Sequence, residues 1–218
     1  MRAFVLFIGT RDNMSTASKT TRRLFMFYSR PLFRTCEIIS NHAARIFLKK
    51  SSLAKPGLRN KLGELDDRRK AFQGDLNRIG NSHGYVCAEC KGKCCGGARE
   101  RDAFLDRVLQ DPDTSHLKAR RKCGEMAAYK LLAAGNKPIA VAEDAERVDG
   151  FCPELTVQGC RIPYDLRPIQ CTAYFCNKTV DALSQHECTT GIKALYGLMK
   201  IQLQAVLLAF RSSLSDKN

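Results

Sequence analysis

The sequence lacks an uninterrupted apolar run of the kind that is typical of a membrane span, and it shows no secretory signal. Its first apolar run, FVLFIG, has six residues, and no small-residue cleavage site follows it. The most apolar later stretch, residues 192–210, is interrupted by lysines and glutamines, so it predicts an amphipathic helix and not a membrane span. We therefore expect a cytoplasmic protein with no transmembrane segment.

Catalytic motifs are missing as well. The sequence contains no glycine-rich phosphate loop, no nucleophile elbow, no HExxH helix and no CxxxCxxC radical motif. His42, His83 and His116 are scattered through the chain and give no metal-site spacing. The sequence thus supports no named reaction class, and it leaves open whether the chain is an enzyme.

Acidic residues are scarce near the start of the chain. Residues 1–80 hold 17 basic and 6 acidic side chains, whereas residues 81–218 hold 19 and 16. We predict that residues 1–55 form a basic, partly disordered leader with one helix over residues 35–50. Its run RRLFMFYSRPLFR, broken by Pro31, suits an anionic partner, either nucleic acid or a membrane surface. The alternative is a leader that is disordered or packs as a helix.

Helical periodicity dominates the rest of the chain, and residues 56–215 are predicted to form a helical domain. One helix ends at Gly80 and carries the apolar stripe Leu62, Leu65, Phe72, Leu76 and Ile79. A short helix covers residues 104–109. The last helix carries the stripe Ile192, Leu195, Tyr196, Met199, Leu203, Val206, Leu207 and Phe210. The predicted fold class is mainly α, a small metal-stabilised domain plus flanking helices, with irregular cysteine-rich loops and one or two short strands.

Eight of the eleven cysteines lie in two short runs. These predicted metal ligands are Cys87, Cys90, Cys94, Cys95, Cys152, Cys160, Cys171 and Cys176. When a turn brings thiolate sulfurs within about 4 Å of each other, they can bind the same soft metal ion. The distance from such an ion to each sulfur is about 2.3 Å. A reducing cytosol keeps such thiols available, and the odd total argues against the alternative, a disulfide framework. Cys36 and Cys123 are expected in the core, and Cys188, beside His186 and Glu187, is a reserve ligand.

The adjacent pair Cys94 and Cys95 bears on the number of centres. Neighbouring side chains point to different sides of the backbone, so both cannot easily occupy two corners of one tetrahedron. Two four-thiolate sites, one polynuclear cluster, or one four-cysteine iron–sulfur cluster with four supporting cysteines all agree with the count. The spacing differs from that of a zinc ribbon, which has a second CxxC, and from the ferredoxin run that ends in CP.

Arg167 lies between two of the predicted ligands in the sequence. A guanidinium near thiolates would offset their charge, or it would bind an anionic substrate. We therefore assign Arg167 a cofactor-binding role. The alternative is a structural arginine that ties the YDLRP segment together through Asp165.

The order of the cysteines resembles that of the YkgJ-like cysteine-cluster proteins, which are described as zinc- or iron-chelating domains. The shared pattern is CxxCxGxCC, then CPxL, GCxI, RPxxC and a final cysteine, and here it runs from Cys87 to Cys176. The similar region covers residues 84–178. Three residues separate Cys90 from the CC pair, whereas the compact family form has two, so the individual ligand assignment stays open.

The resemblance implies a centre held by the eight cysteines, containing either zinc or an iron–sulfur cluster. It implies no particular activity, because that of the family is largely unassigned. One alternative is a zinc-stabilised module that binds nucleic acid or protein without catalysis. Another is an iron–sulfur enzyme related to protein lysine methylases, since a flagellin lysine methylase has similar cysteines.

Overall fold

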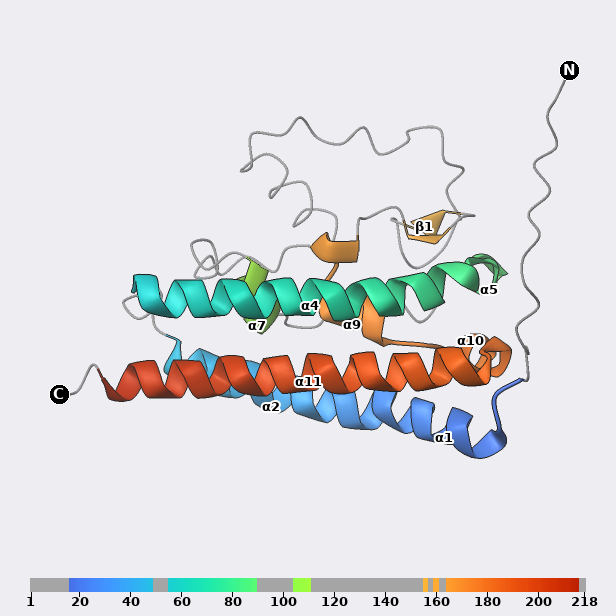
Figure 1. Cartoon of the computed structure of the whole chain (residues 1–218), viewed down its shortest axis with the longest axis horizontal. Coiled ribbons are helices and arrows are strands. Elements are labelled where there is room, and N and C mark those ends of the chain that lie inside the picture. Colours follow the sequence, from blue (N-terminus) through green and yellow to red (C-terminus); the bar gives the residue numbers. More distant parts are fainter. Residues whose placement is uncertain are drawn as a thin grey trace, which may run out of the picture.

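The computed structural model describes residues 16–48, 55–89, 104–110, 155–156, 159–160 and 164–215. These residues are mainly helical, which confirms the mainly α character of the predicted fold class. Three long helical segments pack along one another (Figure 1). The first comprises α1 (Lys19–Phe27), the π-helix η1 (Tyr28–Leu32) and α2 (Phe33–Phe47), and the others are α4 (Pro56–Ser82) and α11 (Gln185–Leu214).

Shorter elements follow the long helices in the chain or connect them. They are α5 (Gly84–Glu89), α7 (Phe104–Gln110), the 3-10 helix η2 (Tyr164–Leu166), α9 (Ile169–Ala173) and α10 (Asn177–Ala182). The strands β1 (Leu155–Thr156) and β2 (Gly159–Cys160) pair antiparallel, with Leu155 opposite Cys160. The predicted helix over residues 104–109 is therefore confirmed as α7.

The first helical segment begins earlier than the sequence predicted. Ser18 caps it, because the Thr21 N–H donates to the Ser18 hydroxyl oxygen over 3.1 Å. Pro31, which was expected to break the basic-aromatic run, lies inside η1 instead. Proline lacks a backbone donor, and a π turn changes the hydrogen-bond register locally around it. The predicted break was wrong, because α1, η1 and α2 are continuous. One side of this run is packed, with Phe25 and Phe33 buried, whereas Leu24 and Phe27 are about half exposed.

Two buried apolar clusters hold the three long segments together. One lies around the first half of α11 and includes Phe25, Leu76, Ile169, Leu195 and Leu198. The other lies around its second half and includes Ala44, Leu62, Leu109, Ile201 and Ala205. Phe72 of α4 packs against both clusters. Helices from both sides of residue 55 contribute to the second cluster, so residues 16–48 share a hydrophobic core with α4.

The buried face of α11 differs in part from the predicted stripe. Leu195 and Met199 of the stripe are buried. Four other members of the stripe are 40–59% exposed: Tyr196, Leu203, Leu207 and Phe210. The inner face that packs on α4 and α2 uses residues that the stripe omitted: Ala194, Leu198, Ile201, Ala205 and Ala209. The stripe and the packed face therefore coincide only in part, because α11 is apolar on two sides.

The start of α11 is fixed by a capping box. The Glu187 N–H donates to the Ser184 hydroxyl over 3.2 Å, and the Ser184 N–H donates to Glu187 Oε2 over 2.8 Å. By length and composition alone, α11 is also long and apolar enough to cross a membrane, with a mean hydropathy of 1.3 in its most apolar window. Half of that window is buried inside the protein, as in a core helix.

The capping box makes stability depend on pH. Burial raises the pKa of Glu187, but hydrogen bonds from the Ser184 backbone and side chain, together with His83, outweigh it and leave that pKa below its usual value of 4.5. The carboxylate therefore stabilises the fold above about pH 4.5, and this contribution is lost as the pH falls through the lowered pKa. We expect Glu187→Gln to lower the free energy of unfolding by about 1 kcal/mol at pH 7 and by less at pH 3.

Urea unfolding at the two pH values measures this difference. Glu64→Gln, an exposed position on α4, makes the same chemical change outside the cap and is expected to alter stability little at either pH. If Glu187→Gln lowered the free energy of unfolding equally at pH 7 and pH 3, the ionised form of Glu187 would not contribute to stability.

Close packing of α1 on α11 requires a glycine at position 191. A Cβ atom added to Gly191 would come within 3.2 Å of Phe25 Cζ, and Phe25 is fully buried. Overpacking costs about 1–3 kcal/mol, which exceeds the gain of about 1 kcal/mol from replacing glycine in a helix. Gly191→Ala is therefore expected to lower the melting temperature. Gly63→Ala, with nothing near its Cβ position, should raise it. A higher melting temperature for both variants would contradict a tight contact between position 191 and Phe25.

Candidate metal centre

The eight predicted ligands divide between described and undescribed parts of the chain. Four of them lie outside the described residues: Cys90, Cys94, Cys95 and Cys152. The backbone of Cys87 is in α5 and that of Cys160 is in β2. Cys171 is in α9, partly exposed, and Cys176 is the N-cap of α10. The structure therefore places four of the eight along the chain, two of them with their side chains.

Helix α5, which carries Cys87, contacts two other elements that contain or directly follow a predicted ligand. Helix α5 contacts both β2 and α10. Figure 1 shows α5, β1 and α10 at the same end of the bundle. The backbone positions of Cys87 and Cys160 thus belong to touching elements, and α10, which begins after Cys176, touches α5. These three cysteines come from both sequence runs.

Cys176 Sγ accepts a backbone hydrogen bond where α10 begins. The Thr179 N–H donates to this sulfur over 3.4 Å, and the Thr179 hydroxyl oxygen lies 3.2 Å from it. Cysteine is an unusual N-cap, because serine, threonine, aspartate and asparagine are preferred there. A backbone N–H that donates to sulfur is a contact of the type that orients and tunes metal-bound thiolates.

Buried polar contacts anchor helix α9, which carries Cys171. The Ile169 N–H donates to Asp106 Oδ2 of α7 over 2.8 Å. The Gln170 amide donates to Glu37 of α2, and both side chains are buried. Because contacts from two separate helices meet on this one turn, the backbone of α9 is held in place before any ligand binds.

A row of polar side chains on α4 holds the segment before Cys171. This polar row consists of Asp66, Arg69, Gln73 and Asn77. Arg69 Nη2 donates to the Asp165 carbonyl over 3.0 Å, and Gln73 Nε2 donates to the Arg167 carbonyl over 3.3 Å. Gln73 Nε2 also lies 2.9 Å from Thr172 Oγ1. The RPxxC segment is therefore tied to α4 mainly through its backbone.

Arg167 is 8% exposed, and its guanidinium donates to Asn77 Oδ1 over 2.8 Å. In the structural alternative, Arg167 was predicted to hold the YDLRP segment together through Asp165. In the structure, Arg69 of α4 provides the contact to the Asp165 backbone. Arg167 thus carries a buried positive charge only four residues before Cys171, beside the segment that the polar row holds.

The polar row is not among the features predicted from the sequence. Its members are spaced three or four residues apart, on the same helix as the predicted apolar stripe. Polar residues that continue a helical stripe next to apolar ones are a signal for buried contacts between elements. Arg69, Gln73 and Asn77 have partners about 90 to 100 positions later in the chain, for example 96 between Arg69 and Asp165, and periodicity within one helix does not indicate such partners.

The reserve candidates occupy structural positions. Cys188 is fully buried in the first apolar cluster, and burial raises the pKa of its thiol. Burial likewise raises the pKa of the Cys36 thiol, which packs against the same cluster. His83, judged uninformative from the sequence, lies 3.1 Å from Glu187 Oε1, next to the cap of α11. Cys123 lies outside the described residues.

Among the side chains that the structure describes, no three Cys, His, Asp or Glu residues gather in a way that could hold a metal ion. Six of the eight predicted ligands have side chains outside that description. A centre formed by all eight would therefore combine Cys171 and Cys176 with these six.

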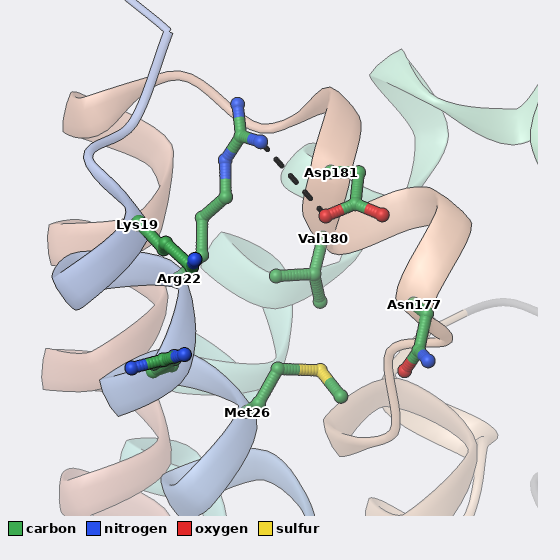
Figure 2. Close-up of a pocket in the computed structure, with 7 residues that line it drawn as sticks. Lys19, Arg22, Met26, Asn177, Val180 and Asp181 are labelled. Carbon is green, nitrogen blue, oxygen red and sulfur yellow. Dashed lines mark ion pairs between the residues drawn. The ribbon is translucent and has the colours of Figure 1, made fainter.

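A pocket of about 630 Å³ lies between α1 and α10. Its lining comprises Lys19, Arg22, Arg23, Met26, Asn177, Val180 and Asp181. Figure 2 shows Arg22 reaching from α1 toward Asp181 of α10, and Arg22 Nη1 lies 3.8 Å from an Asp181 carboxylate oxygen. Three basic side chains and one acidic side chain leave the pocket with an excess of positive charge.

Comparison with protein-family models, with curated proteins and with solved structures finds no match for this chain. The functional assignment therefore depends on the cysteines and on the elements that position them.

Proposed function

We propose that this chain is a metal-binding cysteine-cluster protein that holds zinc or an iron–sulfur cluster through its eight clustered cysteines. One observation carries the proposal: α5 contacts both β2 and α10, and each of these elements contains or is capped by a predicted ligand. Cysteines from two distant stretches of sequence thereby belong to one end of the bundle. Convergence of this kind is what a shared metal centre requires.

The donor chemistry also suits a thiolate-bound centre. Cys176 Sγ accepts the Thr179 N–H, a contact of the type that orients and tunes metal ligands. The anchored turn α9 would hold Cys171 without large rearrangement. When bound, zinc would add folding stability and an iron–sulfur cluster would add electron transfer.

Metal analysis of protein purified without oxygen tests the proposal. Zinc, iron and acid-labile sulfide are measured per chain, and a visible absorption that bleaches with reductant identifies a cluster. Cys171→Ser and Cys176→Ser are expected to lose most of the bound metal. Cys36→Ser changes a thiol outside both cysteine runs, and this variant should keep its bound metal. Wild-type protein with neither metal nor sulfide, or full metal content in both serine variants, would refute the proposal.

The cofactor-binding role of Arg167 has its own test. Arg167→Gln removes the charge, whereas Asn77→Ala removes the hydrogen-bond partner of the guanidinium and leaves the charge in place. If the charge acts on the centre, only Arg167→Gln weakens metal binding, by about tenfold, as is typical of residues around metal ligands. Equal effects of both variants on stability, with unchanged metal affinity, would assign Arg167 a structural role.

The pocket between α1 and α10 supports a second candidate function, binding of an anionic partner. Arg22 and Arg23 come from the basic-aromatic run that is predicted to meet nucleic acid or a membrane surface, and Lys19 lies three residues before it. Lys19→Glu with Arg23→Glu should abolish salt-sensitive binding to an oligonucleotide or to anionic vesicles, and the two probes separate the two partners. Arg78→Glu, an exposed arginine on α4, is the matched control. Unchanged binding by the double variant would exclude the pocket.

A further inference from the structure

The exposed sides of the first helical segment and of α11 are rich in large apolar residues. Of the thirteen large apolar side chains that are exposed in the described part of the chain, ten lie on these two segments. They are 40–59% exposed and comprise Leu24, Phe27, Ile38, Ile39, Ile46, Tyr196, Leu203, Leu207, Phe210 and Leu214. Helix α4 carries none of the thirteen. The exposed apolar surface is therefore concentrated on one pair of segments.

Helices α2 and α11 run side by side in the same direction. The Cys36 thiol donates to the Met199 carbonyl over 3.9 Å, and the rings of Phe47 and Phe210 pack edge-on with centroids 5.1 Å apart. The step from Cys36 to Phe47 equals the step from Met199 to Phe210, so the two helices stay in register between these contacts. In Figure 1, α2 and α4 lie on different sides of α11.

The exposed apolar residues of α2 and α11 lie on one common surface, the outer face. At 3.6 residues per turn, Ile39 and Ile46 lie about a quarter turn from the contact with α11, on the side away from buried Ala44. Leu203 lies within about a quarter turn of the contact with α2, on the side away from buried Ala205. Ala44 and Ala205 belong to the same buried cluster, so both exposed sets lie on the opposite side of the helix pair. The outer face consists of Ile39, Ile46, Tyr196, Leu203, Leu207 and Phe210.

Every exposed charged side chain on α1, α2 and α11 is basic. The one acidic residue within residues 16–48, Glu37, is 3% exposed, and residues 188–214 contain no acidic residue. Helix α4, in contrast, exposes acidic and basic side chains together. On α11, one edge of the outer face is lined by three exposed basic side chains that lie within about 20° of one another around the helix: Lys193, Lys200 and Arg211. The outer face thus combines apolar side chains with a purely basic edge.

We propose that the outer face binds an anionic membrane surface, with α2 and α11 lying flat on it. Interfacial helices bury apolar side chains at the boundary between headgroups and acyl chains, and their lysines and arginines contact the anionic lipids. The outer face supplies both kinds of group, because long basic side chains at its edge extend along apolar surface to the headgroups. Tyr196 and Leu214 are 18 residues apart, about five full turns, so the apolar stripe runs straight along α11 and suits a flat surface.

Charge and side-chain type together favour a membrane over other partners. A nucleic acid would pair with the basic edge, but its bases stack on aromatic side chains and guanidinium groups, and the outer face is mainly aliphatic. A second copy of the chain would offer the basic edge no acidic side chain from its own outer face. An anionic bilayer provides phosphates for the edge and an apolar boundary for the isoleucines and leucines.

Flotation of the full-length, metal-loaded protein with vesicles tests the proposal. The protein is expected to bind vesicles of phosphatidylcholine and phosphatidylglycerol in equal parts. Binding to pure phosphatidylcholine should be weaker by about tenfold or more, and high salt should weaken binding to the mixed vesicles. Ile39→Glu with Leu203→Glu places two carboxylates on the outer face and should weaken binding by about tenfold or more. Lys193→Glu with Lys200→Glu should remove most of the salt dependence.

Asn60→Glu with Ala71→Glu is the matched control, because it adds the same charge at exposed positions of α4 and should leave vesicle binding unchanged. Circular dichroism verifies that each variant is folded. A wild type that does not float with the mixed vesicles, or that floats equally with pure phosphatidylcholine, overturns the proposal. An outer-face variant that binds as tightly as the α4 control overturns it as well.

The outer-face variants leave the pocket between α1 and α10 intact, so the two surfaces are tested separately. Lys19→Glu with Arg23→Glu should keep vesicle binding if the outer face makes the contact. Loss of binding in that variant, with binding kept in Ile39→Glu with Leu203→Glu, would assign the membrane to the pocket and overturn the proposal. Salt-sensitive binding to an oligonucleotide without binding to vesicles would also overturn it. So would a dimer that Leu203→Glu dissociates and that does not bind vesicles.

Discussion

Arg69→Ala is expected to lower the free energy of unfolding by about 3 kcal/mol. Arg69 has no exposed surface, and it donates to Asp66 Oδ1 over 2.7 Å, to the Asp165 carbonyl over 3.0 Å and to the Gln73 side chain. Alanine at position 69 leaves a cavity, and both the Asp165 carbonyl and the Gln73 side chain lose their hydrogen-bond donor. Asp66 keeps its ion pair with Lys70 at 2.9 Å, so the loss lies at the lower end of the range for a broken buried pair.

Urea unfolding followed by circular dichroism measures this loss. Arg78→Ala is the matched control, because Arg78 pairs with Asp75 on the same helix but its side chain is 79% exposed, and the expected change is within about 0.5 kcal/mol. Arg69→Met keeps most of the side-chain volume without the hydrogen bonds, so its stability should lie between those of the two alanine variants. Equal free energies of unfolding for Arg69→Ala and Arg78→Ala would show that the buried contacts of Arg69 do not contribute to stability.

The helices could largely be predicted from local signals. Apolar spacing identified α4, α7 and α11, because each presents apolar residues at helical intervals. One prediction about the first helical segment was wrong. The expected break at Pro31 did not occur, because η1 accommodates the proline within a continuous helix. The packed face of α11 was not evident from the apolar stripe, because alanines form much of that face and larger apolar residues lie on the exposed side.

The candidate site was predictable only at the level of ligand type. Cysteine spacing indicates metal chemistry without any knowledge of the fold. The supports of the site depend on contacts across long sequence separations, such as Gln73 with Thr172 and Asp106 with Ile169. Such pairs produce no periodic pattern in the sequence of either segment. The metal centre, its composition of zinc or an iron–sulfur cluster, the number of centres, and the cofactor-binding role of Arg167 remain predictions.

Removal of the metal is expected to loosen the cysteine-bearing elements while leaving the helical bundle folded. Metal binding to thiolates contributes directly to folding, with about 10–16 kcal/mol in zinc-finger peptides. Here the three long segments have two apolar clusters of their own, so α4 and α11 do not depend on metal. The two-residue strands β1 and β2 and the six-residue helix α5 are too short to be stable without support.

Hydrogen exchange with and without a chelator, or after oxidative loss of a cluster, measures this difference along the chain. Amides of α5, β2 and α10 should exchange at least tenfold faster in the metal-free protein, whereas those of α11 should keep their protection. The turn α9 should show an intermediate change, because Asp106 and Glu37 hold it independently of metal. Cys176→Ser, which is expected to bind little metal, should show the fast exchange before chelator is added and no further change afterwards. Unchanged protection of α5 and β2 after complete removal of metal would mean that the elements bearing Cys87 and Cys160 are not held by a metal centre.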